Sequence, residues 1–258
     1  MENNIIELRM DDEIIKLKQL MEKSDNIVIF SGAGVSTESG LKDFRSDDGL
    51  YNEQYKYPPE TILSHTFFVK MTKEFYEYYF DKMINTQVKP NVAHEIIAKL
   101  EEIGKVKTVI TQNIDGLHQA AGSKNVIELH GSVHRNYCTV CGKFYSLEDI
   151  LLKKDDGVPH CDCGGIIKPD VVLYEEGLDE NNIERAISAC ENADLVIVVG
   201  TSLNVYPAAG FLRYVKGKLA IINKQHTSYD SCCDVIIHDG IGKVLSIACE
   251  DLLKNKNR

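Results

Sequence analysis

Short apolar runs recur along the chain, and stretches with helical spacing lie between several of them. Five runs are predicted to be buried strands, at residues 26–30, 106–111, 126–129, 195–199 and 219–222. Helical patterns occupy residues 5–21, 93–103 and 183–191. Strands that are apolar throughout are typical of a parallel sheet with helices on both faces. The pattern predicts an α/β fold with a Rossmann-like, doubly wound parallel sheet.

Two stretches interrupt this alternation. Residues 46–91 are rich in aromatic residues and mainly helical in pattern, whereas residues 136–168 hold paired cysteines and glycines with little helical signal. We interpret both as insertions that form a smaller lobe, the first a helical module and the second a zinc-binding module. The sheet domain is then discontinuous, built from residues 1–45, 92–135 and 169–258. A cleft between the lobes is the expected ligand site.

Charge and hydropathy argue against several classes of function. The 258 residues include 29 Lys and Arg against 39 Asp and Glu, a net charge of −10. An acidic surface repels phosphate backbones and anionic lipid, so we expect no direct nucleic-acid partner. No apolar run approaches the ~20 residues of a membrane span, and the amino terminus lacks the basic segment of a signal peptide. We therefore expect a cytoplasmic protein that contacts no membrane.

Four of the eight cysteines form two close pairs, Cys138 with Cys141 and Cys161 with Cys163. Without a secretion signal, such pairs indicate a metal site before disulfides, which remain the alternative together with a redox role. Two thiolate pairs separated by nineteen residues suit one tetrahedral Zn²⁺. Four protein ligands leave no open position, so this zinc would be structural. Because the second pair is a tight Cys-x-Cys, His160 is an alternative ligand.

Polar and glycine-rich motifs follow the predicted strands. They are Gly32-Ala33-Gly34-Val35-Ser36-Thr37, Gln112-Asn113-Ile114-Asp115, Leu129-His130-Gly131, Gly200-Thr201-Ser202 and Asn223. In open α/β sheets, ligands bind beyond the carboxyl ends of the strands. The first motif suits the approach of a pyrophosphate to the start of a helix, or alternatively a tight strand-to-helix turn. The hydroxyl groups after Gly200 suit ribose or phosphate oxygens, or alternatively cap a helix near Pro207.

The other polar motifs carry similar alternatives. Consecutive amide and carboxylate groups in the second motif are costly to bury unless they bind a ligand, although a turn would also use them. A histidine such as His130 has an ordinary pKa near ~6.5 and suits a general base, a structural histidine being the alternative. In the loop at 38–46, Arg45 suits a phosphate and Phe44 a ring, but the segment alone favours a solvated loop.

In this order, the motifs resemble those of the sirtuins, the NAD-dependent protein deacylases of the Sir2 family. The resemblance extends from about residue 20 to about residue 250. It implies a Rossmann domain and a small lobe made of a zinc ribbon and a helical module. It also implies NAD as co-substrate, one structural Zn²⁺ per chain, and acyl-lysine proteins or peptides as partners.

The resemblance implies a role for each motif residue. His130 would be the general base, and Asn113 would hold ribose hydroxyls or an ordered water. Asp115 would hold the nicotinamide carboxamide. The NAD site would comprise Gly32, Ala33, Thr37, Phe44, Arg45, Gln112, Asn113, Ile114, Asp115, Gly200, Thr201, Ser202, Asn223 and Ile241. The peptide groove would comprise Val172, Leu173, Tyr174 and Val205. The zinc ligands would be Cys138, Cys141, Cys161 and Cys163.

The implied reaction transfers the acyl group of a lysine to ADP-ribose and releases nicotinamide and free lysine. A mono-ADP-ribosyltransferase on the same fold and a non-catalytic NAD-binding module are the alternatives. Three features depart from the family pattern. Lys42 replaces a proline, Glu175 replaces a glycine beside the peptide groove, and residues 76–79 lack the arginine that pairs acidic acyl groups. Acetyl or longer neutral acyl groups are therefore expected as substrates.

Overall fold

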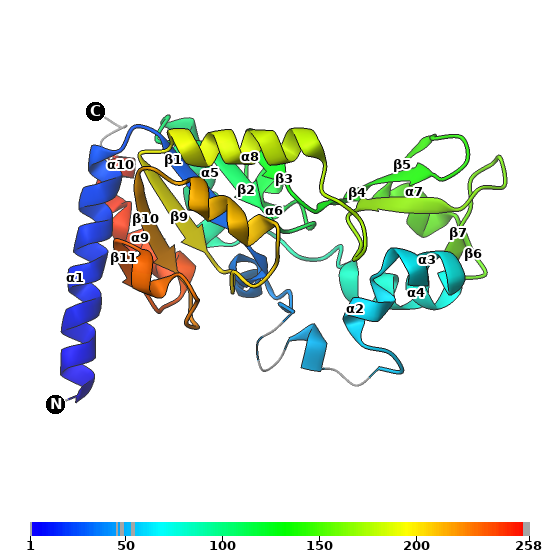
Figure 1. The fold of residues 1–258 in the computed structure, drawn as a ribbon, viewed down its shortest axis with the longest axis horizontal. Helices are drawn as coiled ribbons and strands as arrows, with labels where there is room; N and C mark the ends of the chain where they lie inside the picture. The colour runs from blue at the N-terminus through cyan, green and yellow to red at the C-terminus, as the bar shows by residue number, and fades with distance from the viewer. Residues whose placement is uncertain (1, 45, 47–48, 53–54, 255–258) are drawn as a thin grey trace.

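The structure, a computed structural model, describes residues 2–44, 46, 49–52 and 55–254 (Figure 1). Its largest element is a six-stranded sheet in the order β11-β10-β9-β1-β2-β3, with every pairing parallel. The strands are β1 (Ile27–Ser31), β2 (Val106–Thr111), β3 (Val126–Glu128), β9 (Leu195–Val199), β10 (Lys218–Ile222) and β11 (Val235–Ile237). Strand order reverses between β1 and β9, so their carboxyl ends form the switch point at which such sheets bind ligands.

Helices cover both faces of this sheet (Figure 1). They are α1 (Glu2–Lys23), α5 (Val92–Glu102), α6 (Leu117–Ala120), α8 (Glu180–Asn192), the 3₁₀ segment η5 (Ala208–Tyr214), α9 (Ile241–Ala248) and α10 (Glu250–Lys254). Side chains of α1, α5 and α9 share a core with Ile27 and Ile29, whereas those of α8 and η5 share another with Val28 and Phe30. Successive strand residues point to opposite faces. Packing on both sides therefore explains why every residue of β1 is buried.

Side chains at the helix starts satisfy free backbone N–H groups. The Asn91 side chain accepts hydrogen bonds from the backbone of the first turn of α5, and the His94 ring accepts one from Asn91 N–H in return. At α8, the Asp179 carboxylate accepts from the backbone N–H of Asn182 at 2.9 Å. Such caps fix where each helix begins relative to the strand before it.

The small lobe combines an antiparallel sheet with a group of short helices. Its strands are β4 (Gly131–Cys138), β5 (Phe144–Ser146), β6 (Lys154–Asp155), β7 (Val158–Pro159) and β8 (Ile167–Val171), and its helices are α2 (Pro59–Ile62), α3 (His65–Lys70), α4 (Thr72–Tyr78), the π-turn η4 (Tyr79–Met83) and α7 (Leu147–Leu152). The three-stranded sheet has the order β5-β4-β8. Phe75 and Tyr76 of the helical segment share one core with Cys138, Tyr145 and Ile167. The two insertions therefore pack as a single lobe.

The predicted fold class is confirmed, with several local corrections. The helix expected after Gly32 is replaced by two short 3₁₀ turns, η1 (Ala33–Val35) and η2 (Thr37–Ser39). Strand β11 and helix α9 were not predicted, and the segment 136–168 contains the helix α7. Ile15, an apolar residue within the helical pattern at 5–21, is 52% exposed and does not join the core.

The predicted domain boundaries stay predictions, although the three-stranded sheet extends beyond 136–168, from Gly131 to Val171. None of the helices in the described ranges combines the length and apolar character that a bilayer crossing requires.

Candidate active site

A cavity of about 480 Å³ lies between the carboxyl edge of the parallel sheet and the small lobe. One wall consists of residues that follow β1, β2, β3, β9 and β10. The opposite wall comes from the segment 171–176, which continues β8, and from residues of the helical module such as Leu63 and Tyr79. The cavity therefore occupies the switch point of the sheet, where a ligand is expected from topology alone.

The structure brings the predicted site residues together in this cavity. Those that line it are Gly32, Ala33, Thr37, Phe44, Gln112, Asn113, Ile114, Asp115, His130, Val172, Leu173, Tyr174, Gly200, Thr201, Ser202, Val205, Asn223 and Ile241. Arg45, the remaining predicted NAD-site residue, lies outside the described residues. Motifs far apart in the sequence thus converge on one space.

The glycines after β1 and β9 allow two loops to touch. The backbone N–H of Gly34 donates to the carbonyl oxygen of Gly200 at 2.7 Å, and that of Gly32 donates to Val199 at 3.1 Å. A Cβ added at Gly34 would lie 2.8 Å from the Gly200 Cα, a separation that real Cβ atoms essentially never show. These glycines are therefore required by loop packing, and the cavity wall depends on that packing.

A hydrogen-bonded chain orders the polar groups at the ends of β1 and β2. The Asn113 amide donates to Ser36 Oγ at 3.1 Å, and Ser36 Oγ donates to Asp115 Oδ2 at 2.7 Å. The amide of Gln112 donates to Thr201 Oγ1 at 3.0 Å, which joins the ends of β2 and β9. Thr201 thus contributes to the cavity wall and does not cap η5. Ser36 also lines the cavity; the glycine motif contained it, but sequence reasoning gave it no role.

His130 is held in the tautomer that a general base needs. Its Nδ1 lies 2.8 Å from the carbonyl oxygen of Gln112, and a carbonyl only accepts, so Nδ1 carries the hydrogen. In the neutral ring, Nε2 then retains a lone pair. Burial lowers the pKa of His130 below its ordinary value, although the Gln112 hydrogen bond opposes this shift. The ring is therefore neutral at pH 7 and able to accept a proton.

The segment 171–176 connects the two lobes beside His130. Val172 N–H donates to the His130 carbonyl oxygen at 3.0 Å, and Tyr174 N–H donates to Leu63 at 2.9 Å. Glu175 has a φ of 76°, a left-handed conformation that favours glycine. Its carboxylate accepts a hydrogen bond from Thr66 N–H at the start of α3, 2.9 Å away. The family's glycine position is thus occupied by a residue with both a strained backbone and a local partner.

The helical module places aromatic side chains at the inner end of the cavity. Tyr76 and Tyr79 are fully buried, and Tyr79 lines the cavity. The Tyr79 hydroxyl has no hydrogen-bond partner among the described residues, and burial raises its pKa. Lys82 also lines this wall, which sequence reasoning did not weigh, but its ammonium lies 3.2 Å from the Asp81 carboxylate.

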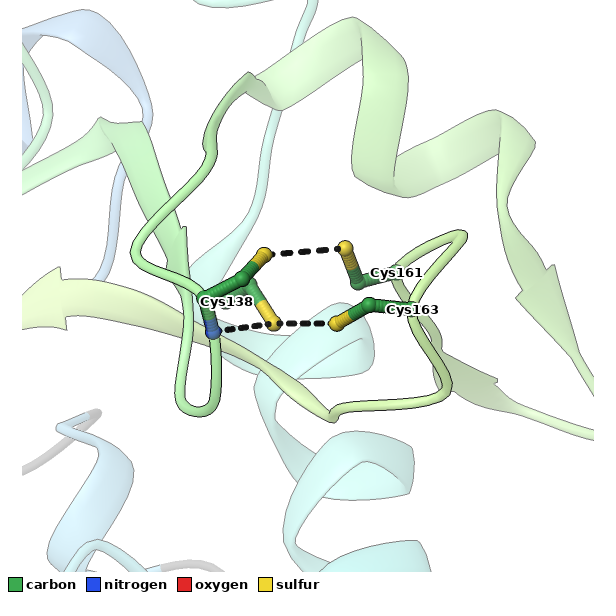
Figure 2. Close-up of side chains that lie close together, drawn as sticks. Cys138, Cys161 and Cys163 are labelled. Atoms are coloured by element: carbon green, nitrogen blue, oxygen red, sulfur yellow. Dashed lines mark hydrogen bonds between the residues drawn. The ribbon is translucent and has the colours of Figure 1, made fainter.

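The four predicted zinc ligands form one cluster. Their sulfur atoms all lie within 4.8 Å of one another, with Cys138 to Cys163 at 3.5 Å and Cys141 to Cys161 at 3.6 Å. Figure 2 shows the Cys161 and Cys163 sulfurs pointing across a small gap toward the loop that begins at Cys138. Tetrahedral zinc with Zn–S bonds of ~2.3 Å places sulfurs about 3.8 Å apart. A disulfide would need about 2.05 Å.

The surroundings of Cys161 favour its thiolate form. Hydrogen bonds from the Cys163 backbone N–H and the Tyr145 hydroxyl lower the pKa of Cys161 to about 6. A Cβ added at Gly165 would lie 2.7 Å from the Cys138 sulfur, so only glycine leaves room there. The four cysteines therefore fit a structural Zn²⁺, and His160 is not part of the cluster.

Comparison with known proteins finds similarity along nearly the whole chain. The model of the Sir2 family matches residues 32–207. The chain is 58% identical over 238 residues to an NAD-dependent protein deacetylase of Clostridium acetobutylicum, across 91% of this chain and 97% of that protein. It is 44% identical over 250 residues to a protein of the same name from Fusobacterium nucleatum, across 95% of each.

Solved structures agree with these relatives. The chain is similar to a Sir2 complex with a p53 peptide and NAD⁺, at 39% identity and a TM-score of 0.81, over 90% of this chain and 95% of that one. It is also similar to Sir2 bound to an acetylated peptide, at 38% identity and a TM-score of 0.81, with the same coverage. Similarity therefore covers both lobes and the cavity between them.

Proposed function

This chain belongs to the Sir2 family, and from that premise we propose that it is an NAD-dependent protein-lysine deacetylase. The proposed reaction transfers the acyl group of a lysine to ADP-ribose and releases nicotinamide and free lysine. One observation supports this proposal above all others. A histidine held neutral with a free Nε2 shares a switch-point cavity with the amide and carboxylate groups that the resemblance assigns to NAD.

We propose that the sheet-edge wall holds NAD. When bound, NAD supplies an electrophilic ribose carbon, C1′, which the weakly nucleophilic acyl oxygen of an acyl-lysine is able to attack. Asp115 would accept hydrogen bonds from the nicotinamide carboxamide, and Asn113 would hold ribose hydroxyls. The shared hydrogen bonds of Ser36 keep these two side chains in fixed relative positions. Pre-positioned groups contribute much of the rate of such a reaction.

Contacts farther along the sheet edge would bind the ADP-ribose part. Thr201 and Asn223 are both buried, and each presents polar atoms at the end of its strand. Ser202 and Ile241 line the same wall. The proposed phosphate contact of Arg45 and the proposed ring contact of Phe44 stay predictions.

His130 would remove the proton from a ribose hydroxyl that attacks the acyl carbon. The lone pair of Nε2 accepts this proton, and the Gln112 carbonyl keeps the opposite nitrogen protonated throughout. Proton transfer therefore changes the charge of the ring without requiring the ring to turn.

The acyl-lysine peptide would lie against the segment 171–176, with Val172, Leu173 and Tyr174 on one side and Val205 on the other. The buried tyrosines behind this groove favour acetyl or longer neutral acyl groups.

The four cysteines would hold one Zn²⁺ that stabilises the small lobe and takes no part in the chemistry. We also propose a cytoplasmic location and no direct nucleic-acid partner, in keeping with the net charge of −10.

Mass spectrometry of an acetyl-lysine peptide, incubated with the protein with and without NAD, tests this function. We expect loss of the acetyl group only with NAD, together with O-acetyl-ADP-ribose. His130→Ala should lower the rate by at least about 100-fold, since general bases typically contribute 10²–10⁴. His160→Ala, which removes an exposed imidazole that does not line the cavity, is the matched control and should retain native activity.

The alternatives predict different products. Transfer of label from NAD to protein without dependence on acyl-lysine would favour a mono-ADP-ribosyltransferase. Binding of NAD with no turnover of any neutral acyl-lysine peptide would favour a non-catalytic module. Either result would refute the deacetylase proposal.

A further inference from the structure

Two histidines and an aspartate converge where the connection between β10 and β11 meets the residue that follows β11. His226 Nδ1 lies 2.8 Å from Asp230 Oδ2, and His238 Nε2 lies 3.5 Å from the same oxygen. The two imidazole rings have centroids 4.2 Å apart. Within the described part of the chain, this trio and the four cysteines are the groups whose ligand atoms are close enough to share a metal ion.

Hydrogen bonds determine which atoms of this trio carry lone pairs. His238 Nδ1 lies 2.8 Å from the carbonyl oxygen of Asn223, so Nδ1 carries the hydrogen and the neutral ring presents bare Nε2. Asp230 Oδ1 already accepts from the Thr227 N–H at 3.0 Å and from the Thr227 hydroxyl at 2.6 Å. Oδ2 therefore faces His238 Nε2 acceptor to acceptor. A cation between the two atoms makes such a pair favourable, as does a proton on Nε2.

We propose that His226, Asp230 and His238 bind a divalent transition-metal ion of the Zn²⁺ type, with one coordination position left to water. Two imidazole nitrogens and one carboxylate oxygen form a ligand set that zinc uses in open sites. The bond from the far nitrogen of His238 to a backbone carbonyl is the usual outer support of a metal-binding histidine.

The distances fit this ion after a small movement. Metal–ligand bonds of ~2.0–2.2 Å in a tetrahedron place ligand atoms about 3.4 Å apart. The His238–Asp230 separation of 3.5 Å already matches this value. The His226–Asp230 separation of 2.8 Å is that of a hydrogen bond donated by His226 Nδ1. Metal binding therefore moves this hydrogen to Nε2 and widens the separation by about 0.6 Å, and the His226 side chain, 87% exposed, has room to move.

The site is connected to the cavity through Asn223. The carbonyl of this residue receives the His238 hydrogen bond, and Asn223, Lys224 and Gln225 line the cavity. A metal held by residues 226, 230 and 238 would restrain the loop that follows β10. We therefore expect metal binding to change the affinity for NAD, a consequence that rests on the proposed function, whereas metal binding itself does not.

Counting bound zinc tests the site directly. Protein whose four-cysteine site is already loaded is dialysed against micromolar Zn²⁺ and analysed by elemental mass spectrometry. We expect two zinc ions per native chain and one in both His226→Ala and His238→Gln. His65→Ala is the matched control, because it removes an imidazole hydrogen-bonded to a carboxylate, that of Glu176 at 2.8 Å, outside any such cluster. It should retain two.

One zinc ion in the native chain would overturn the proposal, and so would two in both cluster variants. Because His226 is exposed, its replacement by alanine tests the site even if His238→Gln fails to fold. Hydrogen exchange gives a second readout: Zn²⁺ should slow exchange at residues 224–230 in the native chain and not in His226→Ala. Equal slowing in both proteins would also overturn the proposal.

Titration of NAD with and without added Zn²⁺ tests the coupling. We expect a severalfold change in the Kd of the native chain and none in His226→Ala. A second bound zinc with an unchanged Kd would overturn the coupling. A second bound zinc in a chain that binds no NAD would overturn the proposed function while supporting the metal site.

Discussion

The two lobes reach a defined structure by different means. The parallel sheet is buried on both faces between aliphatic cores, and all residues of β1 and β9 are buried. In β8 of the small lobe, burial alternates with partial exposure, and the lobe's core combines seven aromatic rings with aliphatic side chains and with Cys138 and Cys161. We therefore expect the small lobe to depend more than the sheet on the metal site that these two cysteines belong to.

This difference in packing determines where each lobe is able to carry polar side chains without unfolding. Each Å² of apolar surface that the sheet buries stabilises the fold by about 25 cal/mol. This stabilisation along the whole sheet allows its carboxyl edge to carry amides, a carboxylate and a histidine. In small modules, structural zinc supplies an apparent ~10–16 kcal/mol, which is similar to the total stability of a domain, ~5–15 kcal/mol. The first test of the comparison is therefore to remove a zinc ligand.

Cys161→Ser should produce the largest effect. We expect loss of the bound zinc, rapid hydrogen exchange in β4 and β8, and retained protection in β1 and β9. Deacetylation should fall below detection, since the segment 171–176 extends from β8. Elemental analysis, exchange mass spectrometry and the peptide assay measure the three effects. Cys232→Ser, which changes an exposed thiol outside the cluster, is the control.

Two results would break the comparison. Loss of protection that spreads equally to β1 would show that the sheet depends on the metal as well. Native activity in a zinc-free variant would show that the small lobe is held by its aromatic core alone.

Ser36→Ala should weaken the chemistry of the sheet edge without unfolding it. The substitution removes one hydrogen bond from Asn113 and one to Asp115. At ~1–1.5 kcal/mol for each bond, kcat/KM should fall about 30- to 150-fold. The midpoint of thermal unfolding should move only slightly. Ser246→Ala, which removes a serine bonded only to its own helix, should leave both quantities unchanged. Equal rates for the two variants would refute a positioning role.

Acid should destabilise the two lobes for separate reasons. In the sheet domain, we expect the effect to come from protonation of His118. Burial lowers the pKa of His118 to about 3, with a smaller contribution from His94. The unfolded chain takes up this proton near pH 6.5, so the unfolded state binds more protons between pH 6.5 and about 3. Stability therefore falls as pH decreases through that range, by up to about 1.4 kcal/mol per pH unit.

His118→Gln should make the hydrogen-exchange protection of β1 depend less steeply on pH. The loss of protection that acid causes in β4 should stay unchanged, because it results from protonation of the cysteine thiolates. Hydrogen exchange measured at pH 7, 6 and 5 on one protein sample gives the pH dependence of protection in both β1 and β4. An unchanged slope in β1 would mean that another buried group controls the acid response of the sheet.

The same difference explains what the sequence was able to predict. Buried parallel strands are largely apolar, so five of the six were predicted from short apolar runs in the sequence. Strand β11 has three residues and was missed. Because parallel strands end at one edge of the sheet, the motifs that follow them were expected to meet there. The motif residues in the described part of the chain do meet at this edge.

Contacts between distant residues were not predictable in this way. Ser36 lies 77 residues from Asn113, and no spacing rule joins a serine to an amide at that separation. The helix expected after Gly32 was wrong because the loop packs against Gly200, which favours short 3₁₀ turns. His226 and His238 match no metal-binding motif, and only the fold of the β10–β11 connection brings them together.

Glu175 offers the finest test, because two small effects oppose each other at the junction of the lobes. Glycine would relieve the left-handed backbone but remove the carboxylate that caps α3 through Thr66. We expect Glu175→Gly to leave the urea midpoint near the native value. Glu175→Gln keeps the strain and offers a weaker acceptor, so its midpoint should be lower. If the glutamine variant were clearly more stable than the glycine variant, the hydrogen bond to Thr66 would outweigh the strain at this position, and the family's glycine would serve the peptide alone.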